Sequence, residues 1–517
     1  MARRILLITT DQMRYDALRC NGGTVARTPA IDALAAQGIR FEHAHAQSVV
    51  CMPARATIIT GQLPSTHGVW MNGVSLPEDH PNVARYLNEH GFRTALIGKA
   101  HFDPWLLGHA RENRMAATDD FGPHRGFEHM ELANHFFLGG SHYQVWMGRN
   151  HPDWMKAFYP IVGTDGRQNS LGGGDTGAVQ LWPNDVPRGL YHTDWVADRT
   201  LAYLDGLADA DDWFVWMSFP DPHHPWDPPR SELARVPWRD LTLPDRYPLT
   251  NDKRIELLDR KPHHWRAAYE ATQHTNVEMP PGFVPARMTA DQLREIEATI
   301  HVENELIDEA CGRVFDRLSA RGWFDDVDVF FTTDHGELQG DFGLLFKGPF
   351  HVESLLRLPF IWRPARACEP AVVTKPVGQL DLAPTFCALA GLEVPDWMQG
   401  DPLPRSDADA AARGFERVVT EWDSEHPRPG AAWLDPAGAV TVTLRTLYRD
   451  DHLCTVYEKS SLYDGTEGEL YDLRNDPLAH ENLWSDPSRQ ALKRALVEDL
   501  YAALPRDRNR SPRTAPV

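Results

Sequence analysis

Short hydrophobic runs alternate with amphipathic helical patterns over the first 400 residues of the chain. This alternation is typical of an α/β sheet whose faces are covered by helices. Polar clusters directly follow the first four of the predicted strands, which indicates a site at the carboxyl ends of the strands. The predicted strands are Arg4 to Thr9, Thr94 to Gly98, Trp213 to Phe219, Asp328 to Thr333 and Leu358 to Trp362.

The clearest predicted helix runs from Met288 to Gly322. Its apolar residues recur at helical spacing along one face, and Gly322 is a suitable stop. These apolar residues are Leu293, Ile296, Ile300, Ile307, Cys311, Val314 and Leu318.

Two regions, residues 103–191 and 225–285, interrupt the alternation and are rich in Pro, Gly, His and Trp. Loops this long are usually functional or disordered, and their aromatic content argues against disorder. We therefore expect them to form a substrate cleft, with most of their tryptophans anchoring loop packing and the others lining the cleft. The tryptophans are Trp105, Trp146, Trp154, Trp182, Trp226 and Trp265.

The C-terminal part has a different organisation. A stretch rich in Pro, Asp and Ala from Asp401 to Arg413 predicts a linker. Beyond it, Val440 to Tyr448 alternates as a strand and Gln490 to Leu504 has a helical pattern. The expected organisation is a catalytic α/β domain at 1–400 and a smaller α+β subdomain at 414–517.

Composition and net charge disfavour several classes of partner and substrate. The 517 residues are 42% hydrophobic and 24% charged, as in a soluble globular protein. A formal net charge of -21 argues against a nucleic-acid partner or an anionic membrane surface. It also disfavours long polyanionic substrates, although a local basic pocket would still accept them.

The N-terminal apolar run, Ile5 to Ile8, is shorter than the roughly 7 to 15 residues of a secretory segment. No run approaches the length of a membrane span. Six cysteines without C-x-x-C pairing indicate reduced thiols. These features predict a cytoplasmic protein.

The segment Cys51-Met52-Pro53-Ala54-Arg55 is the most informative in the chain. Pro53 suits the first turn of a helix, so residue 51 is expected at a helix N-terminus, where backbone donors and the helix dipole favour an anion. Arg55, one turn on, can point back to the same place. The alternative is a buried cysteine beside a solvated arginine.

With the tail Ala56 to Gln62, this segment resembles the sulfatase signature, C-x-P-x-R followed by a T-G-(R/Q) sequence. The segment from Glu469 to Pro477 is similar to the C-terminal subdomain of the same family. The resemblance covers nearly the whole chain and implies an alkaline-phosphatase-like fold, a large mixed, mostly parallel sheet flanked by helices. It also implies that a formylglycine-generating enzyme oxidises Cys51 to formylglycine, whose hydrate is the nucleophile.

Asp11 follows the first strand, and Asp334-His335-Gly336-Glu337 follows the strand at 328–333. Carboxylates that converge at strand ends commonly hold a divalent cation. The resemblance implies the ligands Asp11, Asp334, His335 and modified residue 51, with Gln12 as a ligand or in close support. Gln12 and His335 depart from the commonest sulfatase pattern and resemble choline sulfatases and phosphonate monoester hydrolases. We expect Ca²⁺, with Mn²⁺ as the alternative.

The resemblance also assigns the remaining site residues. Lys99 and His101 match the G-K-x-H motif, where the lysine holds sulfate oxygens and the histidine acts on the second hydroxyl of the hydrate. His223, in Pro222-His223-His224-Pro225, would protonate the leaving alcohol. Lys347, thirteen residues after Asp334, matches a second anion-binding lysine. Asn72 matches an anion-contacting asparagine of phosphonate monoester hydrolases; its alternative is a turn-forming Asn-Gly.

The predicted function is hydrolysis of a small sulfate monoester to an alcohol and inorganic sulfate. Two alternatives remain open: a phosphonate monoester or phosphodiester hydrolase on the same framework, and a non-catalytic sulfated-ligand binding protein in which Cys51 is unmodified. The pair Lys99 and His101 favours the sulfatase. The alcohol could be choline-like, an aryl ring or a sugar. Relatives with a histidine like His335 lead us to expect a homo-oligomer.

Overall fold

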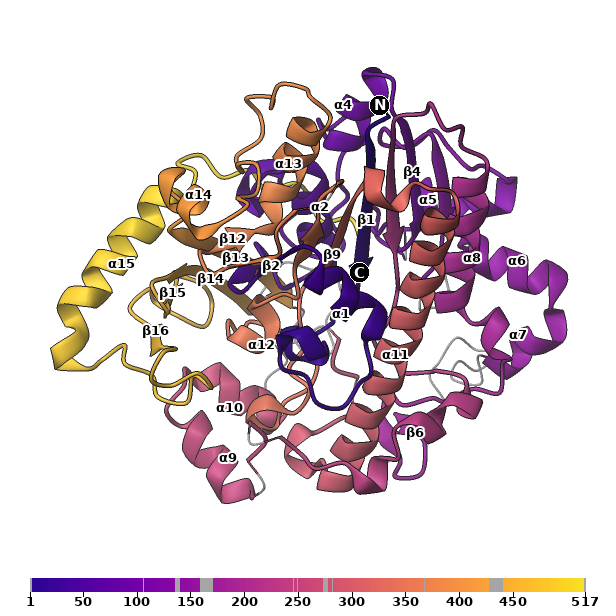
Figure 1. Cartoon of the computed structure of the whole chain (residues 1–517). Coiled ribbons are helices and arrows are strands. Elements are labelled where there is room, and N and C mark those ends of the chain that lie inside the picture. Colours follow the sequence, from indigo (N-terminus) through magenta and orange to yellow (C-terminus); the bar gives the residue numbers. More distant parts are fainter. Residues whose placement is uncertain are drawn as a thin grey trace.

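The computed structural model describes residues 2–105, 107–134, 140–158, 171–244, 246–248, 250–272, 278–280, 282–366, 368–426 and 440–515, without the side chains of 156–158 and 426. An eight-stranded sheet forms its centre, in the order β11-β2-β10-β9-β1-β8-β4-β5 (Figure 1). Strand β10 is antiparallel to both of its neighbours, and the other strand pairs of this sheet are parallel. The strands are β1 (Arg4–Thr10), β2 (Ile39–Phe41), β4 (Arg93–Gly98), β5 (His129–Leu132), β8 (Trp213–Ser218), β9 (Val327–Thr333), β10 (Ile361–Arg363) and β11 (Ala371–Val373).

Helices cover both faces of this sheet because its central strands are apolar on both sides. Ile5 and Leu7 of β1 belong to one buried cluster with residues of α2 (Cys51–Thr60), α4 (Val83–Glu89) and α13 (Leu382–Leu389). Leu6 and Ile8 belong to the opposite cluster, with α1 (Pro29–Ala36), α8 (His192–Asp205) and α11 (Ala290–Ala320). Successive strand residues point to opposite faces, and a continuous apolar run is what a doubly covered parallel sheet requires.

The predicted strands and helix match the structure closely, with one exception. Strands β1, β4, β8 and β9 agree with the predicted bounds to within one residue. Strand β10 begins at Ile361 rather than at the predicted Leu358, because the preceding residues bond to the chain around β2 and β3 (Ala44–His45) outside the ladder. Helix α11 begins with a Thr289 capping box and ends just before Gly322, which has a φ of +68°.

A second, antiparallel sheet forms the C-terminal part, in the order β13 (Arg417–His426), β14 (Val440–Arg449), β15 (His452–Tyr457) and β16 (Gly468–Asp472). Helix α15 (Gln490–Ala503) packs on it and lies at the left edge of Figure 1. The predicted linker contains a helix, α14 (Asp407–Ala412), because Ser406 caps it and Asp407 accepts the N–H groups of Thr374 and Lys375. The boundaries 1–400 and 414–517 stay predictions.

The two predicted cleft regions contain short elements. Residues 103–191 include α5 (Glu112–Met115), β5, α6 (His142–Asn150), α7 (Pro152–Phe158), β6 (Gly172–Gly173) and β7 (Ala178–Val179), and residues 225–285 include α9 (Asn251–Leu258) and α10 (His263–Tyr269). Trp226 and Trp265 are completely buried and anchor loop packing. Short 3-10 helices also occur, and the α-helices and strand of the described residues not yet named are α3 (Pro64–His67), α12 (Glu353–Leu356) and β12 (Val377–Gly378).

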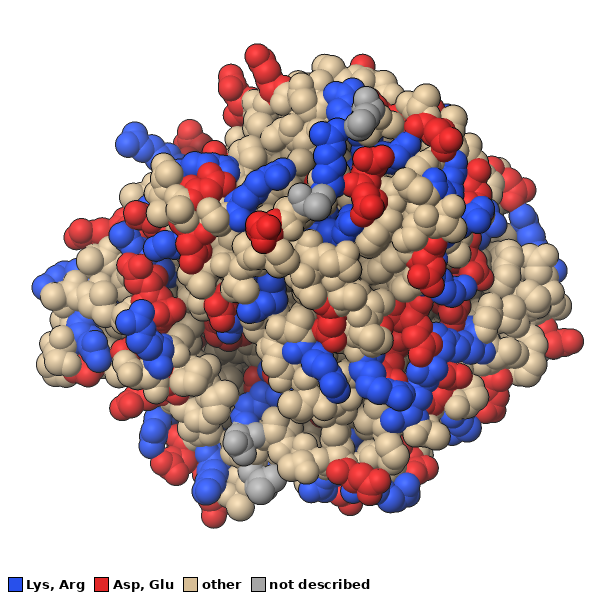
Figure 2. Space-filling model, in the orientation of Figure 1, with Lys and Arg blue, Asp and Glu red and all other residues tan. Residues whose placement is uncertain are grey.

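Acidic and basic side chains are interspersed over the face shown in Figure 2. Among the helices of the described residues, none is both long enough and apolar enough to cross a membrane.

Candidate active site

Four adjacent strands deliver polar residues to one edge of the central sheet. Asp11 follows β1, Lys99 follows β4, and Asp334 follows β9, while His223 lies five residues beyond the end of β8. Because β1 lies between β8 and β9, and β4 is next to β8, these parallel strands end side by side. Gly98, the last residue of β4, lets the chain before Lys99 approach β8 closely. Its φ is +109°, and a Cβ there would lie 1.7 Å from the Ser218 carbonyl oxygen.

Residue 51 is the first residue of α2 and is buried. The N-cap, Val50, offers no side-chain acceptor. Instead, the Asn72 Oδ1 accepts the Met52 N–H at 3.1 Å, so a distant residue caps the helix that carries the nucleophile. The predicted contact of Asn72 with an anion would therefore have to come from its amide nitrogen.

The predicted metal ligands converge. Ligand atoms of Asp11, Cys51, Asp334 and His335 all lie within 4.8 Å of one another. The Cys51 Sγ is 3.3 Å from His335 Nε2 and 3.7 Å from Asp11 Oδ1. The His335 Nδ1 lies 2.9 Å from the Gly336 carbonyl oxygen, which orients Nε2 towards the cluster. Burial, and then Lys347, lowers the pKa of His335 to about 4, so its imidazole is neutral and able to bind a metal.

Gln12 completes this set. Its backbone has a φ of +67°, and its N–H donates to Asp334 Oδ1 at 3.2 Å. Its Nε2 donates to Glu278 Oε2 at 3.1 Å, while Oε1 is buried and has no hydrogen-bond partner among the described residues. A buried, unpaired amide oxygen beside two carboxylates and an imidazole fits the donor preferences of a divalent cation.

Arg55 is completely buried and braces the two carboxylates. Its guanidinium donates to Asp334 Oδ2 at 2.9 Å and to Asp11 Oδ2 at 3.2 Å. It also donates to the Lys99 carbonyl and to Ser218 Oγ, at 2.8 and 2.9 Å. Burial alone would lower the pKa of Arg55, but Asp334 and Asp11 raise it. The sequence predicted that Arg55 would point to the anion; its hydrogen bonds in the structure go to these carboxylates and to the strand ends.

Lys99 and His101 follow β4, and Lys99 shares the Asp11 Oδ2 with Arg55. The Lys99 ammonium pairs with the Asp11 carboxylate, and although burial alone would raise the pKa of Asp11, Lys99 holds it well below its usual range. His101 has a φ of +57°, and its ring lies 5.4 Å from that of Trp105. Burial, and then Lys99, keeps the pKa of His101 well below its ordinary value, so the ring is neutral.

The turn after His101 is held by residues that the sequence analysis missed. Glu112 Oε2 accepts the N–H groups of Phe102 and Asp103, each at 3.2 Å. Arg125 pairs with Asp103 at 2.9 Å and with Glu112 at 3.2 Å. Both acids lie in regions without periodic patterning, so no sequence signal connected them to His101.

Lys347 also reaches residue 51. Its Nζ is 3.0 Å from Cys51 Sγ and 2.6 Å from Glu278 Oε1. Burial alone would lower the pKa of Lys347, but Cys51 and Glu278 raise it. His223 and His224 each approach the Glu278 carboxylate, with Nε2 to oxygen distances of 3.7 Å. Glu278 was not predicted, because it belongs to no motif.

The thiol form of residue 51 is unreactive. Burial, and then the Asp11 carboxylate, raises the pKa of Cys51 to about 12. An unmodified cysteine here is therefore a protonated thiol near neutral pH, a poor nucleophile and a poor ligand.

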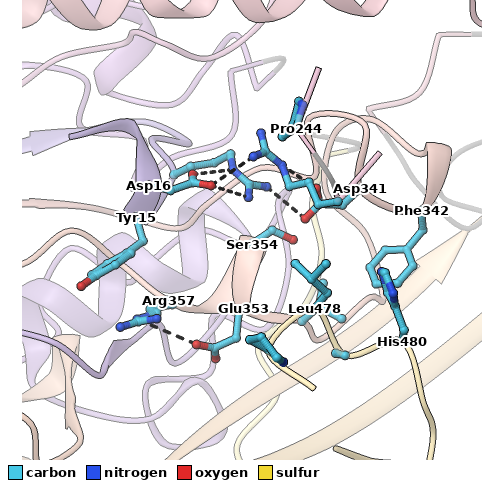
Figure 3. Close-up of a pocket in the computed structure, with 15 residues that line it drawn as sticks. Tyr15, Asp16, Pro244, Asp341, Phe342, Glu353, Ser354, Arg357, Leu478 and His480 are labelled. Atoms are coloured by element: carbon cyan, nitrogen blue, oxygen red, sulfur yellow. Dashed lines mark hydrogen bonds and ion pairs between the residues drawn. The ribbon is translucent and has the colours of Figure 1, made fainter. Parts of the chain in front are cut away.

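A pocket of about 310 Å³ is lined in part by residues 14–16 and 341–342, a few positions after Asp11 and Asp334 (Figure 3). Arg14, three residues after Asp11, donates to the Glu337 carbonyl and pairs with Asp341 at its edge. Arg246 pairs with the same Asp341 at 2.7 Å. The basic side chains of this pocket are thus neutralised by neighbouring acids, and Arg357 likewise lies 3.9 Å from Glu353.

Comparison with known proteins identifies the family. The sulfatase family model matches residues 3–392. The chain is 28% identical to a protein described as "Uncharacterized sulfatase YidJ" of Escherichia coli, over 93% of this chain and 83% of that protein. It is 27% identical to the choline-sulfatase of Rhizobium meliloti, over 93% and 82%. The solved phosphonate monoester hydrolase of Agrobacterium radiobacter has a TM-score of 0.77 at 23% identity, covering 97% of this chain and 95% of that one, which confirms the predicted fold. The chain belongs to the sulfatase family and is a sulfuric ester hydrolase.

Proposed function

We propose that this enzyme hydrolyses a small sulfate monoester to an alcohol and inorganic sulfate, using a formylglycine at position 51 and a divalent cation. The observation that carries the proposal is the position of residue 51. It begins α2, its Sγ lies within 4.8 Å of ligand atoms of Asp11, Asp334 and His335, and Lys347 Nζ is 3.0 Å away. A nucleophile, a cation site and an anion-binding lysine therefore meet at one point.

Asp11, Gln12, Asp334, His335 and residue 51 would hold the cation, with Ca²⁺ as first choice and Mn²⁺ as the alternative. When bound, the cation would supply Lewis acidity, which lowers the pKa of a neighbouring hydroxyl. Formylglycine, once a formylglycine-generating enzyme has made it, supplies a hydrated aldehyde with one hydroxyl to attack sulfur and a second whose deprotonation expels sulfate.

The chain's own residues would perform the other tasks. Lys99 and Lys347 bind the sulfate oxygens and stabilise the charge that develops on them. Arg55 acts as a positioning residue, because it fixes the carboxylates of Asp11 and Asp334. His223 protonates the departing alkoxide, and neutral His101 accepts the proton of the second hydroxyl.

Hydrolysis of phosphonate monoesters or phosphodiesters is the second candidate. Gln12 and His335 in the ligand set support it, as does the similarity in fold to a phosphonate monoester hydrolase. Lys99 and His101, which lie at the site, favour the sulfate ester.

The reducing environment implied by six free cysteines supports the proposal of a cytoplasmic enzyme. A homo-oligomeric state is proposed by analogy with relatives that have a histidine like His335, and light scattering would test it.

The proposal is tested by mass spectrometry of residue 51 in protein co-produced with a formylglycine-generating enzyme. We expect a loss of about 18 Da from the Cys51 peptide, together with turnover of 4-nitrophenyl sulfate that exceeds turnover of 4-nitrophenyl phenylphosphonate. Cys51→Ala is the control and should be inactive. An intact thiol with tight binding of sulfate esters and no turnover would instead support a binding protein.

A further inference from the structure

Glu278 places a carboxylate among the groups that bind the anion. Its Oε1 is 2.6 Å from Lys347 Nζ, and its Oε2 accepts the Gln12 Nε2 at 3.1 Å. One carboxylate oxygen of Glu278, the Cys51 Sγ and a ring nitrogen of His223 lie within 4.8 Å of one another. The side chain is 10% exposed, so water screens this charge weakly.

This position is unusual for an acid. A carboxylate in front of an anion-binding lysine cancels part of the positive charge that would attract an oxyanion. Its contacts come from four separate segments, at residues 12, 223–224 and 347 and at residue 51. A salt bridge needed only for packing would not have to face the nucleophile.

The formal charges at the site show how Glu278 changes its balance. Arg55, Lys99 and Lys347 contribute three positive charges at the site, and Asp11, Asp334 and Glu278 contribute three negative charges. Gln12 adds no charge, and a histidine that binds a cation does so as a neutral imidazole. Whatever cation the ligands hold, removing the Glu278 charge makes the site more positive by one.

We propose that Glu278 sets the charge of the group that the enzyme accepts, favouring esters whose transferred group carries one negative charge over those that carry two. The inference rests on the proposed function and specifies its substrate class. Sulfate monoesters, phosphonate monoesters and phosphodiesters carry one charge on that group, whereas a phosphate monoester carries close to two above neutral pH. The second charge is repelled by Glu278 at short range, in a weakly screened site.

The test compares Glu278→Gln with the wild type at pH 8.5, using formylglycine-containing enzyme. The measured quantity is the ratio of kcat/KM for 4-nitrophenyl phosphate to kcat/KM for 4-nitrophenyl sulfate. Because glutamine has the same shape without the charge, we expect this ratio to rise by about tenfold or more, equivalent to about 1.4 kcal/mol. Glu278→Asp keeps the charge and should keep the ratio near that of the wild type.

Glu256→Gln is the matched control, since it removes one negative charge from an exposed residue of α9. Its ratio should not change, because solvent and salt screen a surface charge. Glu278→Ala also removes the charge, so we expect the same rise in the ratio. It replaces Glu278→Gln if that variant does not fold.

A binding measurement separates this inference from the proposed function. In the Cys51→Ala background, calorimetry compares inorganic phosphate, a dianion at this pH, with ethyl sulfate, a monoanion. Glu278→Gln should tighten phosphate binding about tenfold more than ethyl sulfate binding. An unchanged preference in both assays would overturn the role of Glu278 and leave the sulfatase proposal intact. Absence of turnover with confirmed formylglycine would overturn the proposed function, and the binding preference would still decide the role of Glu278.

Discussion

Asn72 offers the sharpest test of how the nucleophile is positioned. Its Oδ1 accepts the Met52 N–H at 3.1 Å, and its side chain is 1% exposed. Asn72→Ala would remove the cap of α2 and leave a buried N–H without an acceptor. Loss of a cap costs about 1 kcal/mol, and a buried unpaired donor about 1 to 3 kcal/mol. The two costs describe the same N–H group, so we expect the free energy of unfolding to fall by about 1 to 3 kcal/mol.

Asn72→Asp separates the cap from the predicted anion contact. The carboxylate still accepts the Met52 N–H, and the helix N-terminus offsets part of the cost of burying its charge, so stability should fall less than in Asn72→Ala. If the Asn72 amide nitrogen also donates to the substrate, losing that bond to a charged group costs about 1.5 to 3 kcal/mol. The aspartate would then lower kcat/KM by about tenfold to 100-fold while destabilising the fold less than the alanine does.

Urea unfolding followed by tryptophan fluorescence and kcat/KM for a sulfate ester are the two measurements. Asn82→Ala is the matched control, because Asn82 caps α4 by accepting the Arg85 N–H at 3.0 Å and is also buried. It should lose comparable stability and keep kcat/KM. An Asn72→Ala variant as stable as the wild type would refute the capping argument, and a fully active Asn72→Asp variant would refute the anion contact.

Three further predictions follow from the site and its surroundings. Lys347→Met removes an ammonium 3.0 Å from residue 51 and should lower kcat/KM by about 10²- to 10³-fold; a smaller loss in steady-state assays would contradict its role. Exhaustive chelation should abolish turnover, and added Ca²⁺ or Mn²⁺ should restore it, whereas full activity in the chelated enzyme would rule out a required cation. Burial lowers the pKa of Lys261 to about 8, so the unfolded state binds more protons between about pH 8 and 10.5 and stability should rise with pH in that window. Urea titrations of Lys261→Met should lack this rise of up to about 1.4 kcal/mol per pH unit.

Local patterns were sufficient to place three candidate site residues, because each follows a strand whose apolar run marks its end. Asp11, Lys99 and Asp334 could be placed at strand ends from hydrophobicity alone. The order of the strands, which brings these ends together, depends on pairing between segments hundreds of residues apart and leaves no local pattern.

Burial accounts for the detail that the sequence analysis missed at Arg55. A completely buried guanidinium needs acceptors for its N–H groups and a compensating charge. Both are supplied by residues that lie at or just after the ends of strands in the central sheet, whereas Arg55 lies in α2: Asp11, Asp334, Lys99 and Ser218. A motif read along the chain shows that an arginine stands one turn from the nucleophile, but it does not show which carboxylates will share its environment.

The residues of the candidate site are therefore encoded in two ways. Most of them lie at strand termini and at the start of α2, where a shift of one residue would turn a side chain away from the proposed cation site. These constraints produce short motifs. Glu278 comes instead from the 225–285 region, and the turn around His101 depends on Glu112 and Arg125. Loops tolerate changes in length and sequence better than strand ends do, so the selection of substrates can change in these segments while the chemistry at residue 51 stays the same.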